Sequence, residues 1–200
     1  MEDSYGIVLL AAGSSARMGK PKQLLLYKGK TLLQHAVDAA IGTGAKPVVA
    51  VLGANPELLI KEIAAKKVTV VINYGWKEGM GSSIRCGLQK LLGINPGVHA
   101  AILMVCDQPF VTVKLLEELV EKYHKTGKPV IACSYENSRG TPALFDKTIF
   151  AALLALKGDG GAKRIIKGNP DWVNVVNFPL GNIDIDTDPD YDALIKSSSL

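Results

Sequence analysis

The chain has 200 residues, which fits one compact domain, since chains usually divide into several domains only beyond roughly 250 residues. Hydrophobic residues make up 48% of the chain and charged residues 21%, which excludes a disordered chain and leaves enough apolar surface for a core. The 23 basic and 19 acidic residues leave a net charge of +4, which is too small and scattered for nucleic-acid binding but suits a small anionic ligand.

Neither a signal peptide nor a membrane span is expected at the start of the chain. The first residues, MEDSYGIVLLAAG, are acidic where a signal peptide would be basic, and the apolar run Ile7 to Ala12 is far shorter than the roughly 20 residues that span a bilayer. Cys86, Cys106 and Cys133 lack C-x-x-C spacing, which is typical of reduced thiols. These features predict a soluble, cytoplasmic protein.

Short apolar runs alternate with segments of helical periodicity over the first two thirds of the chain. Runs typical of strands buried on both faces are 5–11, 47–52, 68–72, 100–105 and 130–133. Segments with apolar residues three and four apart, typical of helices, are 32–41, 57–66, 83–92 and 115–120. This alternation predicts a three-layer, Rossmann-like α/β domain with a mainly parallel sheet and helices on both sides.

The regular alternation ends after Ser134. A turn-rich connection is expected at 139–142, a short extra strand at 143–145, helices at 147–156 and 162–167, and a strand at 172–176. We expect this irregular late part of the sheet to carry the binding site for an acceptor.

The first predicted strand runs into a glycine-rich loop with the sequence LAAGSSARMGKPK. A loop in this place is the ligand corner of an open α/β sheet. Gly13 and Gly19 allow the backbone to approach a ligand closely, and Arg17, Lys20 and Lys22 add positive charge. The loop therefore indicates an anion site; the alternative is a solvated basic turn.

Two common phosphate-binding loops do not match this one. The dinucleotide fingerprint G-x-G-x-x-G needs a glycine two residues after Gly13, where the chain has Ser15. A P-loop needs four residues between its glycines and then Lys and Ser or Thr, but five residues separate Gly13 from Gly19, and Lys20 precedes Pro21.

Asp107 follows a predicted buried strand, in the sequence MVCDQP. A carboxylate at the carboxyl end of a central strand faces the ligand crevice, and Mg²⁺ prefers one or two carboxylates together with substrate phosphates. We interpret Asp107 as a metal ligand; the alternative is an N-cap for the helix that begins near Val113.

A second group of acids stands near the end of the chain, in the sequence IDIDTDPD. Asp184 and Asp186 are two residues apart in a strand-like stretch and would face the same side. Asp188 and Asp190 are expected as cap and first-turn acids of a last helix. Asp186 would then bind Mg²⁺ together with Asp107, unless all four are turn acids.

The sequence EGMGSSIRCGL precedes and opens a predicted helix. Its glycines and serines leave backbone and hydroxyl groups free to contact a base or ribose; the alternative is a flexible turn with a serine cap. On its own, the later sequence GDGGAKR is typical of a turn followed by the basic first residues of a helix.

The glycine-rich loop resembles the signature of the MobA-like NTP transferase family, and within it the branch that completes molybdenum cofactor. EGMGSSIRCGL is similar to the cytidylyltransferase sequence EGMSSSLRxGL, with Gly81 in place of a serine, and LAAG in place of LAGG also points to cytosine. IDIDTDPD resembles the DxDTxxD pattern. GTPALF and GDGGAK are similar to GHPxLF and GDxGAR, with Thr141 and Lys163 in place of histidine and arginine.

The resemblance implies a single domain over 1–200 of the GT-A-like nucleotidyltransferase type, with an antiparallel strand in its sheet. It implies a nucleotide-binding half of about 1–110 and an acceptor-binding half of about 111–200. The nucleotide site would comprise Leu10, Ala11, Ala12, Gly13, Arg17, Lys22, Gly79, Gly81, Ser82 and Asp107. The acceptor site would comprise Gly140, Pro142, Gly161 and Lys163. Catalysis would rest on Arg17, Lys22 and Asp107, and the metal on Asp107 and Asp186.

The expected activity is transfer of CMP from CTP to the terminal phosphate of molybdopterin, with Mg²⁺ or Mn²⁺ as cofactor and pyrophosphate as product. The expected protein is a cytoplasmic monomer, with a molybdenum hydroxylase as partner and no nucleic acid or membrane. Two alternatives stay open: transfer to a sugar or alcohol phosphate, and a non-catalytic protein that carries cofactor to the hydroxylase.

Overall fold

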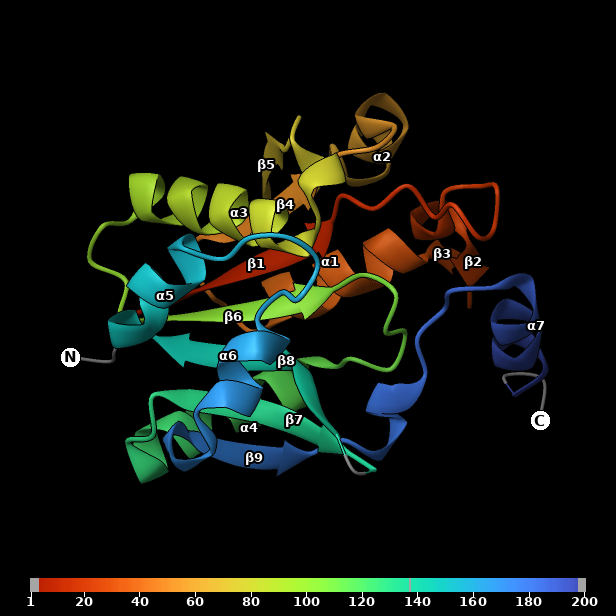
Figure 1. Ribbon diagram of the computed structural model, residues 1–200. Coiled ribbons are helices and arrows are strands. Elements are labelled where there is room, and N and C mark those ends of the chain that lie inside the picture. The colour runs from red at the N-terminus through yellow and green to blue at the C-terminus, as the bar shows by residue number, and fades with distance from the viewer. Residues whose placement is uncertain (1–3, 137, 198–200) are drawn as a thin grey trace.

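The computed structural model describes residues 4–136 and 138–197. Its centre is a seven-stranded sheet of order β5-β4-β1-β6-β8-β7-β9, with a separate pair β2-β3 (Figure 1). The strands are β1 (Tyr5–Ala11), β2 (Leu26–Tyr27), β3 (Lys30–Thr31), β4 (Val48–Leu52), β5 (Thr69–Ile72), β6 (Ala100–Val105), β7 (Val130–Tyr135), β8 (Ser138–Asp146) and β9 (Val173–Asn177). β8 runs antiparallel to both of its neighbours, and every other pairing in the large sheet is parallel. The predicted mainly parallel sheet with an antiparallel strand is confirmed.

Helices cover both faces of the sheet (Figure 1). The α-helices are α1 (Leu32–Gly42), α2 (Pro56–Ile63), α3 (Met80–Ile94), α4 (Val113–Thr126), α5 (Phe150–Leu154), α6 (Lys163–Gly168) and α7 (Asp188–Ser197). Short 3₁₀ helices are η1 (Lys22–Leu24), η2 (Trp76–Glu78), η3 (Lys147–Ile149), η4 (Pro170–Trp172) and η5 (Pro179–Asn182). α1, α2 and α4 pack on one face and α3, α5 and α6 on the other, so the domain has three layers. None of the described helices is long and apolar enough to cross a membrane.

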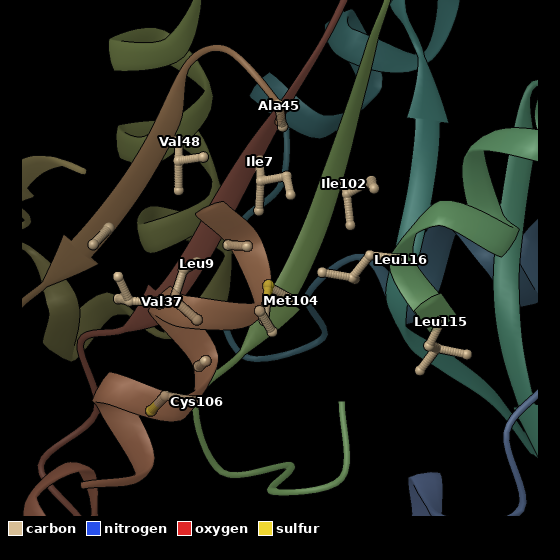
Figure 2. Close-up of a cluster of buried hydrophobic side chains, with 14 of the residues drawn as sticks. Ile7, Leu9, Val37, Ala45, Val48, Ile102, Met104, Cys106, Leu115 and Leu116 are labelled. Atoms are coloured by element: carbon tan, nitrogen blue, oxygen red, sulfur yellow. The ribbon is translucent and has the colours of Figure 1, made fainter. Parts of the chain in front are cut away.

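Strand β1 lies in the middle of the core because it is apolar on both faces. Its alternate side chains point in opposite directions, so Ile7 and Leu9 pack beneath α1, while Val8 and Leu10 pack against α3. Figure 2 shows Leu9 beside Val37 of α1, and Ile7 further along the strand between Val48 and Ile102. The carboxyl end of β1 and the loop that follows it are thereby fixed to a rigid sheet.

The turn expected at 139–142 is wrong, because these residues belong to β8. The pairing of β8 with β7 shifts between the pairs Ala132–Ala143 and Cys133–Gly140, so Thr141 and Pro142 lie in a bulge. Proline, which cannot donate to a strand ladder, is tolerated in a bulge. The composition of this segment is that of a turn, but its partner strand holds it extended.

The strand-like stretch expected around Asp184 and Asp186 is also wrong. No strand is formed between η5 and α7; the chain runs as a loop, held by a hydrogen bond from the Ile185 amide to the Asp107 carbonyl. α7 begins at Asp188 itself, and Asp190 lies in its first turn as predicted, where its carboxylate accepts hydrogen bonds from the backbone amides of Asp186 and Thr187.

Candidate active site

Lys22, Asp107 and Asp186 meet where the glycine-rich loop faces the carboxyl end of β6. The ammonium nitrogen Nζ of Lys22 lies 2.5 Å from Oδ2 of Asp107 and 2.6 Å from Oδ1 of Asp186. Lys22 opens η1, Asp107 follows β6 and Asp186 precedes α7, so three segments far apart in sequence supply the cluster. The structure thus brings together the predicted catalytic lysine and both predicted metal ligands.

The glycine-rich loop is held in shape by two residues that the sequence analysis did not single out. Gln23 is buried, and its side-chain amide donates hydrogen bonds of 3.2 Å to the Ala11 carbonyl and 2.8 Å to the Gly13 carbonyl. The hydroxyl of Ser15 accepts a hydrogen bond of 3.0 Å from the Lys22 amide. These bonds close the loop on itself and aim Lys22 at Asp107. In the sequence, the signal for such a role is a glutamine directly after the glycine-rich loop.

The charges of this cluster strongly influence one another. Burial alone would lower the pKa of Lys22, but the charge of Asp107 and the hydrogen bonds with Asp107 and Asp186 raise it above its usual value. The hydrogen bond from Lys22 outweighs burial at Asp186 and lowers the pKa of that carboxyl. At Asp184, burial and the charges of Asp107 and Asp186 raise the pKa to about 6. Because its pKa is raised, Lys22 stays protonated and positively charged.

Arg17 and Lys20 are two solvent-exposed cations at the edge of the cluster formed by Lys22, Asp107 and Asp186. Arg17 Nη1 lies 3.1 Å from Oδ2 of Asp186, and its side chain is 73% exposed. Lys20 Nζ lies 2.9 Å from Oδ1 of Asp188. Arg17 therefore reaches the cluster while keeping most of its guanidinium free for a further anion.

Asp107 is not the cap of α4, which was the alternative to its predicted role as a metal ligand. The N-cap of α4 is Thr112, whose side chain accepts a hydrogen bond from the Leu115 amide. Oδ1 of Asp107 is buried, and no hydrogen-bond partner within the described part of the chain reaches it. A buried carboxylate oxygen without a donor fits a cation.

Within residues 4–136 and 138–197, no group of three or more His, Cys, Asp or Glu side chains is arranged to hold a metal ion. A cation on Asp107 and Asp186 would therefore complete its coordination with water or substrate phosphates, as Mg²⁺ commonly does.

Gly79 and Gly81, two of the predicted nucleotide-binding residues at the start of α3, pack against the loop between α5 and α6. A side chain at Gly79, whose φ is +99°, would place its Cβ 2.3 Å from Oδ1 of Asp159, and the Gly81 amide donates a hydrogen bond of 2.9 Å to the Gly158 carbonyl. The Ser82 hydroxyl accepts a hydrogen bond from the buried amide of Asn73, a residue that the sequence analysis missed. The small residues have a packing role here, and their contacts with a nucleotide stay a prediction.

The predicted acceptor-binding residues lie on two separate elements. Gly140 and Pro142 belong to β8, where Gly140 leaves space for the Tyr135 hydroxyl, 2.2 Å from an added Cβ. Tyr135, which ends β7 beside Gly140, has its pKa raised by burial and then by the charge of Asp184. Gly161 packs against Met80, and Lys163 begins α6 with an exposed side chain. Their contacts with an acceptor are likewise a prediction.

The glycine-rich loop at the end of β1 and the lysine–carboxylate cluster at the end of β6 lie at the carboxyl ends of the strands, where α/β domains of this kind bind their ligands. Residues 7–173 match the model of the MobA-like NTP transferase domain. The chain belongs to this family.

The chain is similar over most of its length to several known proteins. Nicotine blue oxidoreductase of Paenarthrobacter nicotinovorans is 31% identical over 85% of each chain, and purine catabolism protein PucB of Bacillus subtilis is 27% identical over 96% of each. The crystal structure of Rv0371c from Mycobacterium tuberculosis has a TM-score of 0.84 at 28% identity, covering 98% of this chain and 99% of that one. A complex of Rv0371c with manganese has a TM-score of 0.81 at 27% identity, with 97% and 99% covered.

Proposed function

We propose that the protein transfers CMP from CTP to the terminal phosphate of molybdopterin and releases pyrophosphate. The observation that carries the proposal is Lys22 held between Asp107 and Asp186 beside the glycine-rich loop. Membership of the NTP transferase family supports nucleotidyl transfer. The cytidine base, the molybdopterin acceptor and the hydroxylase partner rest on the motif resemblance, and the cytoplasmic location and the monomeric state are expectations from the sequence.

The arrangement of cations suits an in-line displacement at phosphorus. A phosphate oxygen of the acceptor attacks the α-phosphorus of CTP, the bond from that phosphorus to the β-phosphate bridge oxygen breaks, and its electron pair leaves with pyrophosphate. Lys22 would balance charge near the α-phosphate and Arg17 charge on the outer phosphates. The acceptor phosphate is already an anion, so positioning and charge are sufficient without a side-chain nucleophile.

Asp107 and Asp186 would hold the divalent cation. The buried, unpartnered Oδ1 of Asp107 supports this assignment, as does the manganese complex of the similar Rv0371c. When bound, Mg²⁺ or Mn²⁺ would neutralise negative charge on the triphosphate.

The alternatives have less support from the site. A non-catalytic carrier of cofactor has no need for a buried lysine shared by two carboxylates beside an anion loop. A redox activity like that named for nicotine blue oxidoreductase would need its own electron carrier, and the loop after β1 lacks the G-x-G-x-x-G fingerprint of dinucleotide binding.

One experiment separates the candidates. Each of the four ribonucleoside triphosphates is incubated with the protein and Mg²⁺ or Mn²⁺, with molybdopterin, with a sugar phosphate or without acceptor, and pyrophosphate release is measured. We expect release with CTP and molybdopterin together and much less with GTP. Comparable rates with CTP and GTP would contradict the cytidine assignment, and release only with a sugar phosphate would contradict the acceptor. Molybdopterin binding without any release would identify a carrier.

A further inference from the structure

The segment from Leu156 to Ala162 lies across the start of α3. In Figure 1 the chain between α5 and α6 passes beside the first turn of this helix. The Gly81 amide, which belongs to the first turn and has no partner inside its own helix, donates to the Gly158 carbonyl at 2.9 Å. A Cβ at Gly161 would lie 2.8 Å from Sδ of Met80, so the Met80 side chain packs directly on the backbone of Gly161.

Arg85 of α3 bonds both to this segment and to η2, the 3₁₀ helix that precedes α3. Its Nη1 donates a hydrogen bond to the Leu156 carbonyl, and its Nη2 lies 3.2 Å from Oε2 of Glu78 at the end of η2. The guanidinium has a planar fork of donors, which lets one side chain hold two acceptors in fixed directions. The Arg85 side chain is 28% exposed and its bond to the Leu156 carbonyl is partly buried, whereas the Glu78 side chain is 66% exposed and its bond to Arg85 is open to water.

Only the two ends of the segment are packed in the core: Leu156 and Ala162 are buried, whereas residues 157–160 between them are exposed. A cavity of about 400 Å³ lies beside Arg85. The cavity is lined by Glu78, Arg85 and residues 154–158. Atoms that face a cavity lack packing partners there, so the segment gains little dispersion energy on that side. Between its buried ends, the segment is attached to the start of α3 by the Arg85 bond to the Leu156 carbonyl and by the Gly81–Gly158 bond. Exposed residues held by so few bonds open at low free-energy cost.

We propose that Arg85 is a positioning residue that couples the nucleotide site to the acceptor site. The inference rests on the proposed function, in which Gly79, Gly81 and Ser82 contact the nucleotide and Gly161 and Lys163 contact the acceptor. Because Arg85 and the Gly81 amide join these two segments, a nucleotide that orders the start of α3 also orders residues 156–162. The acceptor then binds a loop whose ordering cost is already met, so each substrate raises the affinity for the other by the same factor.

The test is amide hydrogen exchange on the whole chain, with and without CTP and Mg²⁺, in wild type, Arg85→Ala, Arg85→Lys and the control Lys90→Ala. Lys90 is an exposed residue of the same helix. Without ligand, Arg85→Ala should speed exchange in residues 156–162 and at Gly81 by roughly 10- to 100-fold, the effect of losing a hydrogen bond to a charged group. Arg85→Lys should lie between Arg85→Ala and wild type, and Lys90→Ala should match wild type.

With CTP and Mg²⁺, wild type should show slower exchange both in the glycine-rich loop and in residues 156–162. In Arg85→Ala the glycine-rich loop should be protected as in wild type, while residues 156–162 stay fast; a residue that only stabilises the fold would not separate the two regions. Protection of the glycine-rich loop alone in wild type would overturn the coupling, as would equal ligand-free exchange in wild type and Arg85→Ala. If CTP with Mg²⁺ does not protect residues 12–22, the proposed function fails, and the ligand-free comparison still decides whether Arg85 holds the segment.

Discussion

Lys22 and Asp107, 85 positions apart in the chain, form an ion pair with 2.5 Å between Nζ and Oδ2. The lysine side chain is 13% exposed and the aspartate 19%, so separating them would leave charges that water solvates poorly. The pair therefore fixes the end of the glycine-rich loop against the end of β6. A triphosphate that binds this loop meets an ammonium group already in place, and it competes with two carboxylates for that group.

Asp107→Asn tests the metal assignment. An amide is a poor ligand for Mg²⁺, so we expect pyrophosphate release to fall at least about 100-fold, the scale of losing one charged contact at a transition state. Asparagine has nearly the same size, and Lys22 keeps Asp186 as a partner, so the free energy of unfolding should fall by only about 1 to 2 kcal/mol. Denaturant unfolding followed by circular dichroism gives the second quantity. Near-normal activity at saturating Mg²⁺ would show that Asp107 is not the ligand.

Gly87→Ala and Gly93→Ala on α3 should have opposite effects. A Cβ at Gly87 would lie 2.3 Å from Cγ1 of Val8 and 2.6 Å from Cγ2 of Val51, both buried in the sheet, so we expect a loss of about 1 to 3 kcal/mol in unfolding free energy. A Cβ at Gly93 meets nothing within 4 Å. There the higher helix propensity of alanine should stabilise by up to about 1 kcal/mol. Equal effects in urea unfolding would mean that α3 does not pack this closely on β1 and β4.

Much of this architecture follows from local sequence patterns. Strand β1 was predictable because a buried strand in a parallel sheet is apolar on both faces, and the glycine-rich loop because its glycines and cations are consecutive. The pairing of Lys22 with Asp107 depends on the strand order and could not be derived from either segment alone. Gln23 and Asn73 belong to no predicted site, yet both are buried, and they hold the glycine-rich loop and the start of α3. Residues 139–142 were mistaken for a turn because only the partner strand extends them.

Asp38 should make a small contribution to stability that is lost in acid. Its carboxylate lies 2.7 Å from Lys30 Nζ and 2.5 Å from Lys66 Nζ. Burial would raise the pKa of Asp38, but the hydrogen bonds and charges of the two lysines outweigh it and lower the pKa below the ordinary 3.8. The folded-state pKa is therefore below the unfolded one, so this stability is fully present above about pH 4 and disappears as the pH falls through the folded-state pKa.

Asp38→Asn should accordingly lower the unfolding free energy by under about 1 kcal/mol at pH 7 and should make no difference below the folded-state pKa. Urea unfolding at a series of pH values measures this, with Asp192→Asn on the exposed side of α7 as the control. A difference between Asp38→Asn and wild type that persists unchanged into strong acid would mean that the effect is not electrostatic.

Lys22 and Arg17 should have separable kinetic roles. The Arg17 side chain is 73% exposed and lies at the outer edge of the cluster, where it would contact the phosphates equally in the ground state and the transition state. Arg17→Ala should therefore mainly raise the KM for CTP. The Lys22 side chain is 13% exposed and pairs with Asp107, where in the proposed reaction charge would develop only as the bond to pyrophosphate breaks, so Lys22→Ala should mainly lower kcat. Loss of a charge-assisted contact of about 2 to 3 kcal/mol corresponds to roughly a 30- to 150-fold effect.

Steady-state kinetics with CTP as the varied substrate distinguish these roles, and Lys90→Ala serves as the control for removing one positive charge from the surface. The unfolding free energy of Lys22→Ala should be measured alongside, because Asp107 and Asp186 then lose their shared partner. If Lys22→Ala changes only KM and Arg17→Ala only kcat, the triphosphate runs along the loop in the opposite direction, with its α-phosphate at Arg17 and its outer phosphates at Lys22.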